Sequence, residues 1–302
     1  MTAIFDQLSS PRILRGTRAD IWLATYLDGV PTAPVTPVPT VSVTNQDGTV
    51  IASGDAVISA DNKRLEFTLT AAQTAEANQL TATWSDVIMG SDPAFDATTY
   101  HEVCGDVLFT LPEARNHENG VMKNATTFAN SLILEARDRI WDEFESILEY
   151  TLGGRVSEAT ISGDGLGDII LTRSHVHSVR AISTRYNGVW TAFTADELAD
   201  VFSTKQGRLV RETLGYWPIG EANIRVTYEA GDVPIHRALK RAALVVLRDQ
   251  LNRSDLPSRA TSQTSEMGTF QLSTPGLRGA HFGIPEVDVV LNRMKSNLPG
   301  FA

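Results

Sequence analysis

Alternating apolar and polar positions dominate the first third of the chain. They occur in short runs separated by turn residues, which is the pattern of half-buried strands. The predicted strands are residues 19–27, 38–44, 50–52, 56–59, 65–70, 80–87 and 100–109. Asp47-Gly48, a pair that favours tight hairpins, lies between two of them. Because no helical period interrupts these runs, residues 1–110 are predicted to form an all-β sandwich of the immunoglobulin-like type, with Trp22 and Trp84 in its core.

From Thr126 the apolar positions recur at steps of three and four, the period of an amphipathic helix. This helix is predicted to run for about 25 residues and to end before Gly153-Gly154, because glycine favours the left-handed conformation that closes helices. Its apolar positions are Phe128, Leu132, Ala136, Ile140, Phe144, Ile147 and Leu148. Short strand-like runs follow at residues 168–172, 177–185, 190–191 and 207–211, with the hairpin signal Asn187-Gly188 between two of them.

Residues 223–251 hold the clearest succession of elements. Ile224, Val226 and Tyr228 alternate with polar residues as in a half-buried strand, and a turn at residues 229–232 follows. Pro234 then precedes an alanine-rich and arginine-rich helix predicted at residues 235–251, because proline is tolerated at a first helical position.

The end of the chain is predicted to contain an arm and a last helix. Residues 252–283 are rich in Ser, Thr, Gly and Gln and are predicted to be a flexible arm, or an extended arm that orders on a partner. Pro285 begins a short terminal helix. Residues 111–302 are therefore predicted to form an α+β domain that is mainly helical, with a small antiparallel sheet.

Composition limits the class of protein. The chain has 302 residues, of which 42% are hydrophobic, so it can bury real cores and is expected to form two domains. It has no run of about 18 apolar residues and no basic, apolar leader, so neither a membrane span nor a signal peptide is expected. The single cysteine, Cys104, excludes an internal disulfide framework and a cysteine-based zinc site.

Charge is distributed unevenly along the chain. The net charge is −10, which is unfavourable for a nucleic-acid-binding protein because phosphate neutralisation supplies most of that affinity. Residues 205–302 nevertheless carry 13 basic and 9 acidic side chains, a net charge of +4. This basic third is interpreted as a docking surface for an acidic protein partner.

No catalytic or ligand-binding motif is found. The run from Gly163 to Gly167 has the spacing of a glycine-rich turn but lacks the order and the basic residue of a phosphate-binding loop. His175 and His177 could supply two metal ligands, but no motif places a third. No nucleophile elbow is present. We therefore expect no enzyme activity, no cofactor and no metal.

Acidic residues recur at helical steps in the predicted long helix. They are Glu135, Asp138, Asp142, Glu145 and Glu149. A solvated helix face is the ordinary interpretation of such a stripe. Two functional interpretations remain open: the stripe lines a channel and repels DNA phosphates, or it meets the basic face around Arg237 and Arg241 of a neighbouring subunit.

Two stretches resemble a known family. The first is Val-Thr-Tyr-Glu-Ala-Gly at residues 226–231, followed by Asp-Val-Pro and the basic, alanine-rich helix. The second is Gly-Ile-Pro-Glu-Val-Asp-Val-Val-Leu-Asn at residues 283–292. Together they resemble the head–tail connector (adaptor, head-completion) proteins of tailed bacteriophages, over residues 111–301. The sandwich lies outside the minimal family and resembles the immunoglobulin-like additions of phage virion proteins.

The resemblance implies a structural role in the virion. A homo-oligomeric ring of about twelve copies would lie in the neck under the portal protein and join the DNA-filled head to the next head-completion (stopper) protein or tail. DNA would pass through the channel without sequence-specific binding, no membrane would be involved, and assembly would take place in the host cytoplasm. The alternatives are another virion protein, such as a tail terminator or decoration protein, or a carbohydrate-binding module that exposes Trp22 or Trp84.

Candidate contact residues follow from this interpretation. Those expected at a subunit or portal interface are Arg237, Arg241, Arg248, Phe270, Pro285, Val287 and Leu291. Those expected to line a channel, or to form an acidic face between subunits, are Glu135, Asp138, Asp142 and Glu145.

Overall fold

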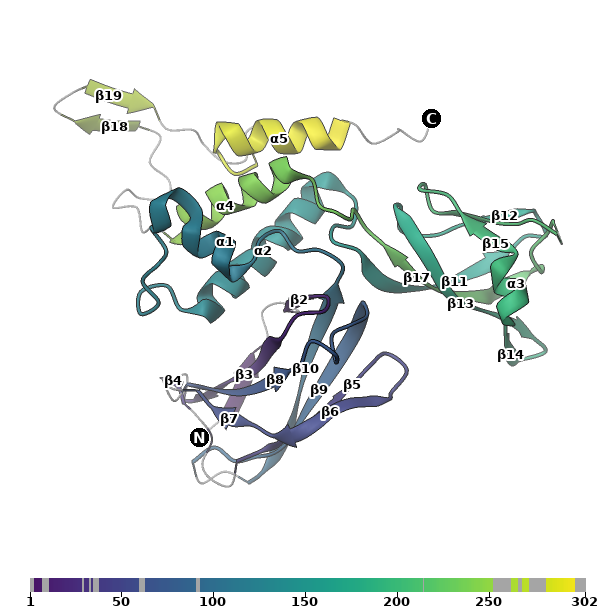
Figure 1. The fold of residues 1–302 in the computed structure, drawn as a ribbon, viewed down its shortest axis with the longest axis horizontal. Helices are drawn as coiled ribbons and strands as arrows, with labels where there is room; N and C mark the ends of the chain where they lie inside the picture. The colour runs from purple at the N-terminus through teal and green to yellow at the C-terminus, as the bar shows by residue number, and fades with distance from the viewer. Residues whose placement is uncertain are drawn as a thin grey trace. The chain divides into compact units, whose positions relative to one another are not determined.

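The computed structural model describes most of the chain, which divides into two compact units. The described residues are 3–6, 11–28, 30–32, 34, 38–59, 63–90, 93–213, 215–251, 262–265, 268–271 and 281–296. The first unit contains Met1–Val107 and Gly153–Pro234, and the second contains Leu108–Leu152 and Ile235–Ala302. Each unit is therefore built from two separate stretches of sequence, and Figure 1 shows the elements of each. No described helix has the length and apolar character of a membrane span.

The N-terminal part of the first unit consists of two packed sheets. One has the order β1-β3-β8-β7, with β4 also paired to β3, and the other has the order β2-β10-β9-β5-β6. All described pairings are antiparallel except that of β2 with β10. The strands are β1 Ala3–Asp6, β2 Arg12–Leu14, β3 Ala19–Leu27, β4 Val30–Pro31, β5 Thr40–Thr44, β6 Val50–Asp55, β7 Val57–Ile58, β8 Arg64–Leu69, β9 Asn78–Val87 and β10 Phe95–Cys104.

Alternate side chains of the two sheets form one shared core. Ile21 and Leu23 of β3 meet Val41 and Val43 of β5 and the ring of Trp84 in this core. Trp84 is fully buried, as predicted. Trp22 lies on the opposite side of β3 and is only half-buried, so the prediction that it belongs to the core is wrong.

A buried polar chain crosses this core. Trp84 Nε1 donates a hydrogen bond to Thr99 Oγ1 (3.0 Å), and Thr99 Oγ1 lies 3.0 Å from His101 Nε2. His101 Nδ1 is also buried and has no hydrogen-bond partner among the described residues. Burial lowers the pKa of His101 from 6.5 to about 3, because the charged imidazolium would lose its hydration.

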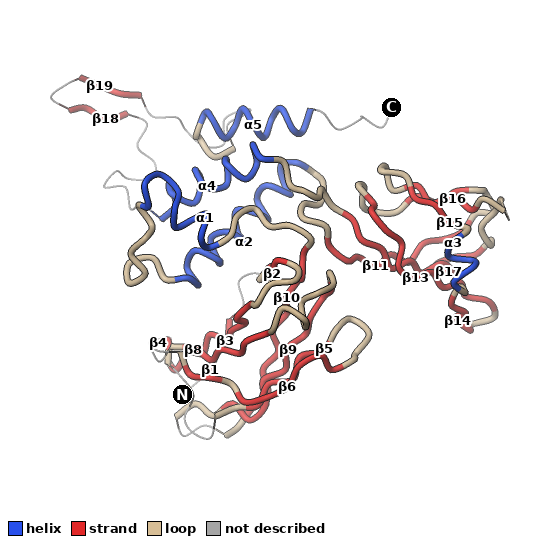
Figure 2. Tube along the Cα trace, in the orientation of Figure 1, coloured by secondary structure: helices blue, strands red, loops and turns tan. Residues whose placement is uncertain are grey.

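The second part of the first unit is also built from strands. A four-stranded sheet, β11-β17-β13-β14, packs on a three-stranded sheet, β12-β16-β15, across a core that includes Trp217 and Tyr228. The elements are β11 Arg155–Gly163, β12 Asp168–Ile170, β13 Val176–Tyr186, β14 Val189–Ala192, α3 Ala195–Ala199, β15 Val201–Ser203, β16 Arg208–Arg211 and β17 Gly220–Ala230. Figure 2 shows that strands dominate this part.

These sheets overturn the predicted fold class of residues 111–302. The region is not a mainly helical domain with one small sheet, since two sheets of four and three strands occupy the chain between α2 and α4. Between α2 and α4, the strands β11 and β15 fall outside all the predicted runs. β11 pairs with β17 along most of its length although more than fifty residues separate the two strands, and local patterns do not reveal such a partner.

Backbone hydrogen bonds and ion pairs join the two parts of the first unit. Gly105 N donates to Gly154 O (2.9 Å), and Asp106 N donates to Gly153 O (3.0 Å). Glu102 of β10 accepts a hydrogen bond from Arg155 Nη1 at 2.8 Å and lies 3.6 Å from Arg12 Nε. Both arginines are buried, so this carboxylate compensates charge that would otherwise be costly in a low-dielectric interior.

The second unit is helical. It contains α1 Leu111–Asn116, the 3₁₀ helix η1 His117–Gly120, α2 Asn130–Leu148, α4 Arg237–Leu251 and α5 Pro285–Ser296. α2 packs against α1, α4 and α5, and α4 also packs against α5. The buried positions on α4 (Leu239, Ala242, Ala243, Val246 and Leu247) lie three or four residues apart or adjacent, as the sequence predicted for this helix.

One carboxylate fixes the loop before α5. Asp288 is buried and accepts hydrogen bonds from the backbone N–H groups of His281 (2.9 Å), Phe282 (2.9 Å) and Gly283 (3.1 Å). The ring of Phe282 meets Phe144 of α2 edge-to-face, with ring centroids 5.5 Å apart. Asp288 thus links the terminal helix to the loop that anchors it on α2.

The predicted arm is described only in part. Residues 262–265 and 268–271 form the paired strands β18 Ser262–Ser265 and β19 Gly268–Gln271. Residues 252–261, 266–267 and 272–280 of the arm lie outside the described residues, as does the side chain of Phe270.

His101→Gln is expected to flatten the pH dependence of stability. Between pH 6.5 and about 3 the unfolded chain binds a proton at His101 that the folded chain does not, because the folded-state pKa is lowered. The stability due to neutral His101 is thus complete above pH 6.5 and falls as the pH drops. Between pH 6.5 and pH 5 the wild-type loss is about 2 kcal/mol. Urea unfolding at several pH values measures it. The exposed His236 supplies the matched control, since His236→Gln should keep the wild-type slope, and an unchanged slope in His101→Gln would contradict the assignment.

Asp288→Asn is expected to loosen the terminal helix. The substitution removes the charge from three buried hydrogen bonds and turns an amide N–H₂ towards at least one backbone donor, so the free energy of unfolding should fall by about 2–3 kcal/mol. Hydrogen exchange at the amides of residues 281–283 should accelerate. Asp249→Asn makes the same chemical change at an exposed position of α4 and should alter stability by no more than about 0.5 kcal/mol.

Candidate functional site

The turn between β17 and α4 is a structural corner. Gly231 N donates to His175 O (3.0 Å), and Gly153 N donates to Asp232 O (3.1 Å). Gly231 O is hydrogen-bonded to His177 Nε2. The polar backbone groups of this turn are thus used within the first unit, and no described arrangement at the corner resembles a ligand site.

Glu229, near the end of β17, also uses its carboxylate within the first unit. Glu229 Oε1 accepts a hydrogen bond from Arg180 Nε at 2.9 Å, and Glu229 Oε2 lies 3.9 Å from Arg15 Nη1. Arg180 comes from β13, and Arg15 follows β2. The carboxylate therefore connects the sandwich to the second pair of sheets.

The arginines of α4 differ in their partners. Arg241 Nη2 lies 3.2 Å from Glu286 Oε1 of α5, and Arg248 Nη1 lies 2.5 Å from Glu118 Oε2 of η1. All three arginines are exposed, and Arg237 makes no ion pair among the described residues. Arg237 thus differs from Arg241 and Arg248, which are both ion-paired within the helical unit.

The predicted contact residues of α5 divide between surface and core. Pro285 is exposed at the start of the helix, whereas Val287 and Leu291 are fully buried in the helical unit. The sequence pattern predicted their helical spacing, but the helix turns that face inward, onto α2 and α4. Val287 and Leu291 therefore stabilise the unit and cannot contact a partner in this fold.

The acidic residues of α2 do not form one exposed stripe. Asp138 is buried 3.1 Å from Arg137 Nε, and Glu145 Oε1 accepts hydrogen bonds from Trp141 Nε1 (2.9 Å) and Leu152 N (2.7 Å). Glu135 is half-buried and Asp142 is exposed. Because α1, α4 and α5 all pack on α2, its buried arc is wider than a single apolar stripe.

Partial burial also affects an acidic residue outside the predicted set. It raises the pKa of Glu143, and the neighbouring Asp142 acts in the same direction while Arg139 opposes it. Glu149, exposed at the end of this helix, lies 2.6 Å from Lys295 Nζ of α5. The exposed charge of α2 is therefore partly balanced within the unit.

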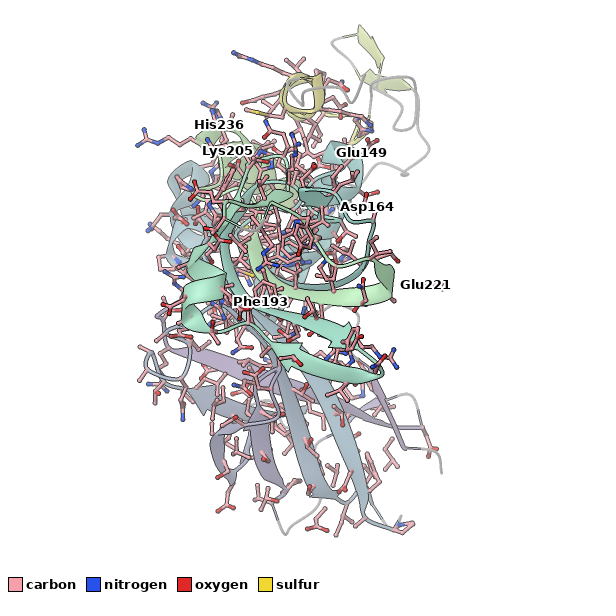
Figure 3. The ribbon with its side chains drawn as sticks, turned by 90° about the vertical axis from the view of Figure 1, so that its right-hand side faces the viewer. Glu149, Asp164, Phe193, Lys205, Glu221 and His236 are labelled. Carbon is pink, nitrogen blue, oxygen red and sulfur yellow. The ribbon has the colours of Figure 1, made fainter. Side chains whose placement is uncertain are left out.

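The glycine-rich loop is shaped by close backbone packing. A Cβ on Gly163 would lie 1.9 Å from Pro218 O, and one on Gly167 would lie 2.9 Å from Gly215 O. Asp164, within this loop, is labelled in Figure 3, and its Oδ1 accepts a hydrogen bond from Leu166 N at 2.9 Å, so the carboxylate is used inside the turn. Both observations support a structural turn and not a phosphate site.

The histidines and tryptophans are also placed structurally. His175 lies before β13, with Nδ1 3.3 Å from Ser174 Oγ. Within the described ranges no group of three or more His, Cys, Asp or Glu side chains could hold a metal ion. Trp217 is buried and stacks on Phe193, with ring centroids 6.3 Å apart, and Arg211 lies over both rings. Trp84 is too deeply buried to hold a sugar.

Sequence reasoning missed two exposed apolar surfaces in the first unit. The first, called here the hairpin tip, is the pair Tyr186 and Val189, which flank the Asn187-Gly188 turn between β13 and β14. The second, called here the sheet patch, consists of Ile170, Phe202 and Val210 on the outer face of the three-stranded sheet. β16 lies within the predicted run 207–211. Its adjacent apolar residues, Leu209 and Val210, stand at an inward and an outward position, and this pair could have indicated the apolar side chain on the outer face.

Comparison with known proteins yields little. No protein-family model matches the chain. No curated protein sequence matches it either. Among solved structures, a chain from "Neck of empty GTA particle computed with C6 symmetry" is similar, with 16% sequence identity and a TM-score of 0.38. The similarity covers 50% of this chain and 82% of that chain. A likeness of this size does not establish a shared fold.

Proposed function

We propose that this chain is a structural protein of a phage-like virion, a head-to-tail adaptor that assembles as a ring of about twelve copies under the portal. The ring joins the DNA-filled head to the next head-completion protein or the tail and leaves a channel through which DNA passes. This role requires contacts with proteins on two sides and needs no catalytic group, cofactor or metal.

The observation that carries the proposal is where the two resembling stretches lie. The first supplies the end of β17, the corner and α4, and the second supplies the start of α5. α4 and α5 pack against each other in the helical unit, and Arg241 pairs with Glu286 across them. Stretches separated by about thirty residues that carry one resemblance and form one packed unit support a common origin for that unit.

The polar groups of the chain fit a structural role. Three carboxylates that are buried or half-buried are used in ion pairs or hydrogen bonds: Glu229 with two arginines, Glu145 with a tryptophan and a backbone amide, Asp288 with three amides. Groups held in this way stabilise the fold and are poorly placed to exchange protons with a substrate. That the protein is not an enzyme is part of the proposal.

The three arginines of α4 differ in whether they are available to a partner protein. Arg241 and Arg248 already have acidic partners within the helical unit, so pairing of Arg241 with Asp142 of a neighbouring copy would require an existing ion pair to break. Arg237, at the first turn of α4, has no such competitor among the described residues. We therefore assign Arg237 to the contact with an acidic surface of the portal.

The test is portal binding. Purified protein, alone and mixed with the portal of the same particle, is examined by electron microscopy, and rings or added density below the portal are expected. Arg237→Glu should weaken binding at least about tenfold, whereas Arg237→Lys should retain most of it, because the contact is electrostatic.

The matched control is Arg18→Glu. Arg18 is also an exposed arginine without an ion pair among the described residues, but it lies in the sandwich. It should bind portal as the wild type does. Wild-type protein that never binds portal would overturn the proposed function, and wild-type affinity in Arg237→Glu would overturn the assignment of Arg237.

A further inference from the structure

The hairpin tip and the sheet patch are unusual because both are apolar and exposed. Tyr186 and Val189 are 79% and 66% exposed, and Ile170 and Phe202 are 63% and 46% exposed. In a sheet with one face in water the outward positions are normally polar. Exposed apolar side chains that lie side by side, as in each of these two surfaces, are candidates for burial against another protein.

The hairpin tip presents its side chains rigidly. Asn187 and Gly188 have φ angles of +48° and +84°, as in the two-residue turn that matches strand twist. Tyr186 and Val189 are directly opposite each other across this turn. A tyrosine held on a tight hairpin loses little conformational entropy when it is buried by a partner, which is why such residues anchor interfaces.

The sheet patch combines exposed apolar side chains with one ion pair. Phe202 of β15 and Val210 of β16 are opposite each other, and Ile170 of β12 is opposite Arg208. Arg208 is neutralised by the adjacent Asp168 on the same face. The centre of this face therefore carries apolar side chains and one internal ion pair.

The surroundings of the two surfaces have opposite charge. Near the hairpin tip, the exposed Arg185 directly precedes Tyr186, and its guanidinium lies 6.0 Å from the centre of the Trp190 ring on the other face of the hairpin. Beside Phe202 the chain carries Asp200 and Glu212, joined by a backbone hydrogen bond of 3.0 Å, and α3 adds Asp196 and Glu197. Opposite charges around two apolar surfaces favour their association with each other.

The two surfaces are separate parts of one chain. Figure 1 shows the β13–β14 hairpin and strands β12 and β15 at opposite ends of this part, with α3 between them. The high exposure of both shows that neither covers the other within one copy. A contact between them must therefore join two copies, and because the surfaces differ it is head-to-tail, the type that generates rings.

We propose that the hairpin tip of one copy docks on the sheet patch of a second copy. The inference rests on the proposed function in one respect, namely that a ring under the portal needs a repeated head-to-tail contact. A three-stranded face about 10 Å wide and four residues long covers on the order of 130 Å². That is well below the about 800 Å² per partner of a stable pair, so a single contact is weak and gains strength when every copy makes two.

Disulfide trapping tests the contact directly. The chain has one cysteine, Cys104, which is buried, so cysteines introduced at exposed positions can be followed without interference. Val189→Cys protein mixed with Ile170→Cys protein should form a disulfide-linked heterodimer at least about tenfold faster than a control pair. The control replaces Val189→Cys with Val57→Cys, an equally exposed valine of the sandwich. Equal rates in both pairs would overturn the proposal.

Mixing two defective proteins gives a second, independent readout. Tyr186→Ser combined with Val189→Thr disables the tip, and Phe202→Glu disables the patch, and each protein should self-associate at least about tenfold more weakly than the wild type in sedimentation velocity. A head-to-tail contact predicts that the mixture forms pairs and nothing larger, because one working tip and one working patch remain. Larger assemblies in the mixture, or unchanged association of either variant, would contradict it.

The outcomes separate this inference from the proposed function. If the wild-type protein binds portal but Val189→Cys and Ile170→Cys do not link faster than the control pair, self-docking is wrong and the adaptor role stands. If they link rapidly but no portal binding occurs, the adaptor role is wrong and the self-contact stands. If the tip or patch variants lose portal binding while the cysteines remain unlinked, these surfaces contact the portal and not a second copy.

Discussion

Three passages of the chain between the two units are tied together by backbone hydrogen bonds, and the rest of the structure depends on this tie. The residues just after β10, those just before β11 and those just before α4 bond to one another through Gly105, Asp106, Gly153, Gly154 and Asp232. A side chain at Gly154 would be strained, because φ is +61° there and a Cβ would lie 2.4 Å from Val233 Cγ2. The buried arginines around Glu102 add charge pairing to the same junction. Two sequence-distant β parts thereby become one unit.

Local patterns predicted local elements well. β3 occupies the residues predicted for it, and β17, α4 and α5 occur within about two to four residues of their predicted bounds. The fold class of the C-terminal region was wrong because its sheets depend on remote pairing. β11 carries Glu158 and Thr160 among its apolar residues and is identified as a strand of this sheet only by its pairing with β17, which lies far along the chain. Residues 1–110 were easier to interpret because their neighbouring strands mostly alternate and turn over short distances.

The candidate contact residues were predicted less well than the elements that carry them. A helical wheel shows which residues share a face, but it does not show how many helices surround that face. Asp138 and Glu145 were therefore assigned to solvent although α2 is contacted by three other helices. The acidic partner of Arg241 is Glu286 of α5. The sequence predicted where α5 begins but did not predict that α5 packs against α4. The exposed apolar surfaces were missed for the related reason that their strands were not recognised as a separate sheet.

The same hydrogen bonds hold together the two ends of one long segment of the chain. The segment from Gly153 to Pro234 leaves the helical unit after α2 and returns to it before α4. Its ends are adjacent, since Gly153 N and Asp232 O are 3.1 Å apart. Ends that meet in this way allow a whole domain to be inserted into a host without disturbing it, as circular permutation and domain insertion require. The β part between α2 and α4 accordingly has the geometry of an inserted domain. A short loop that replaced it could connect α2 to α4 directly.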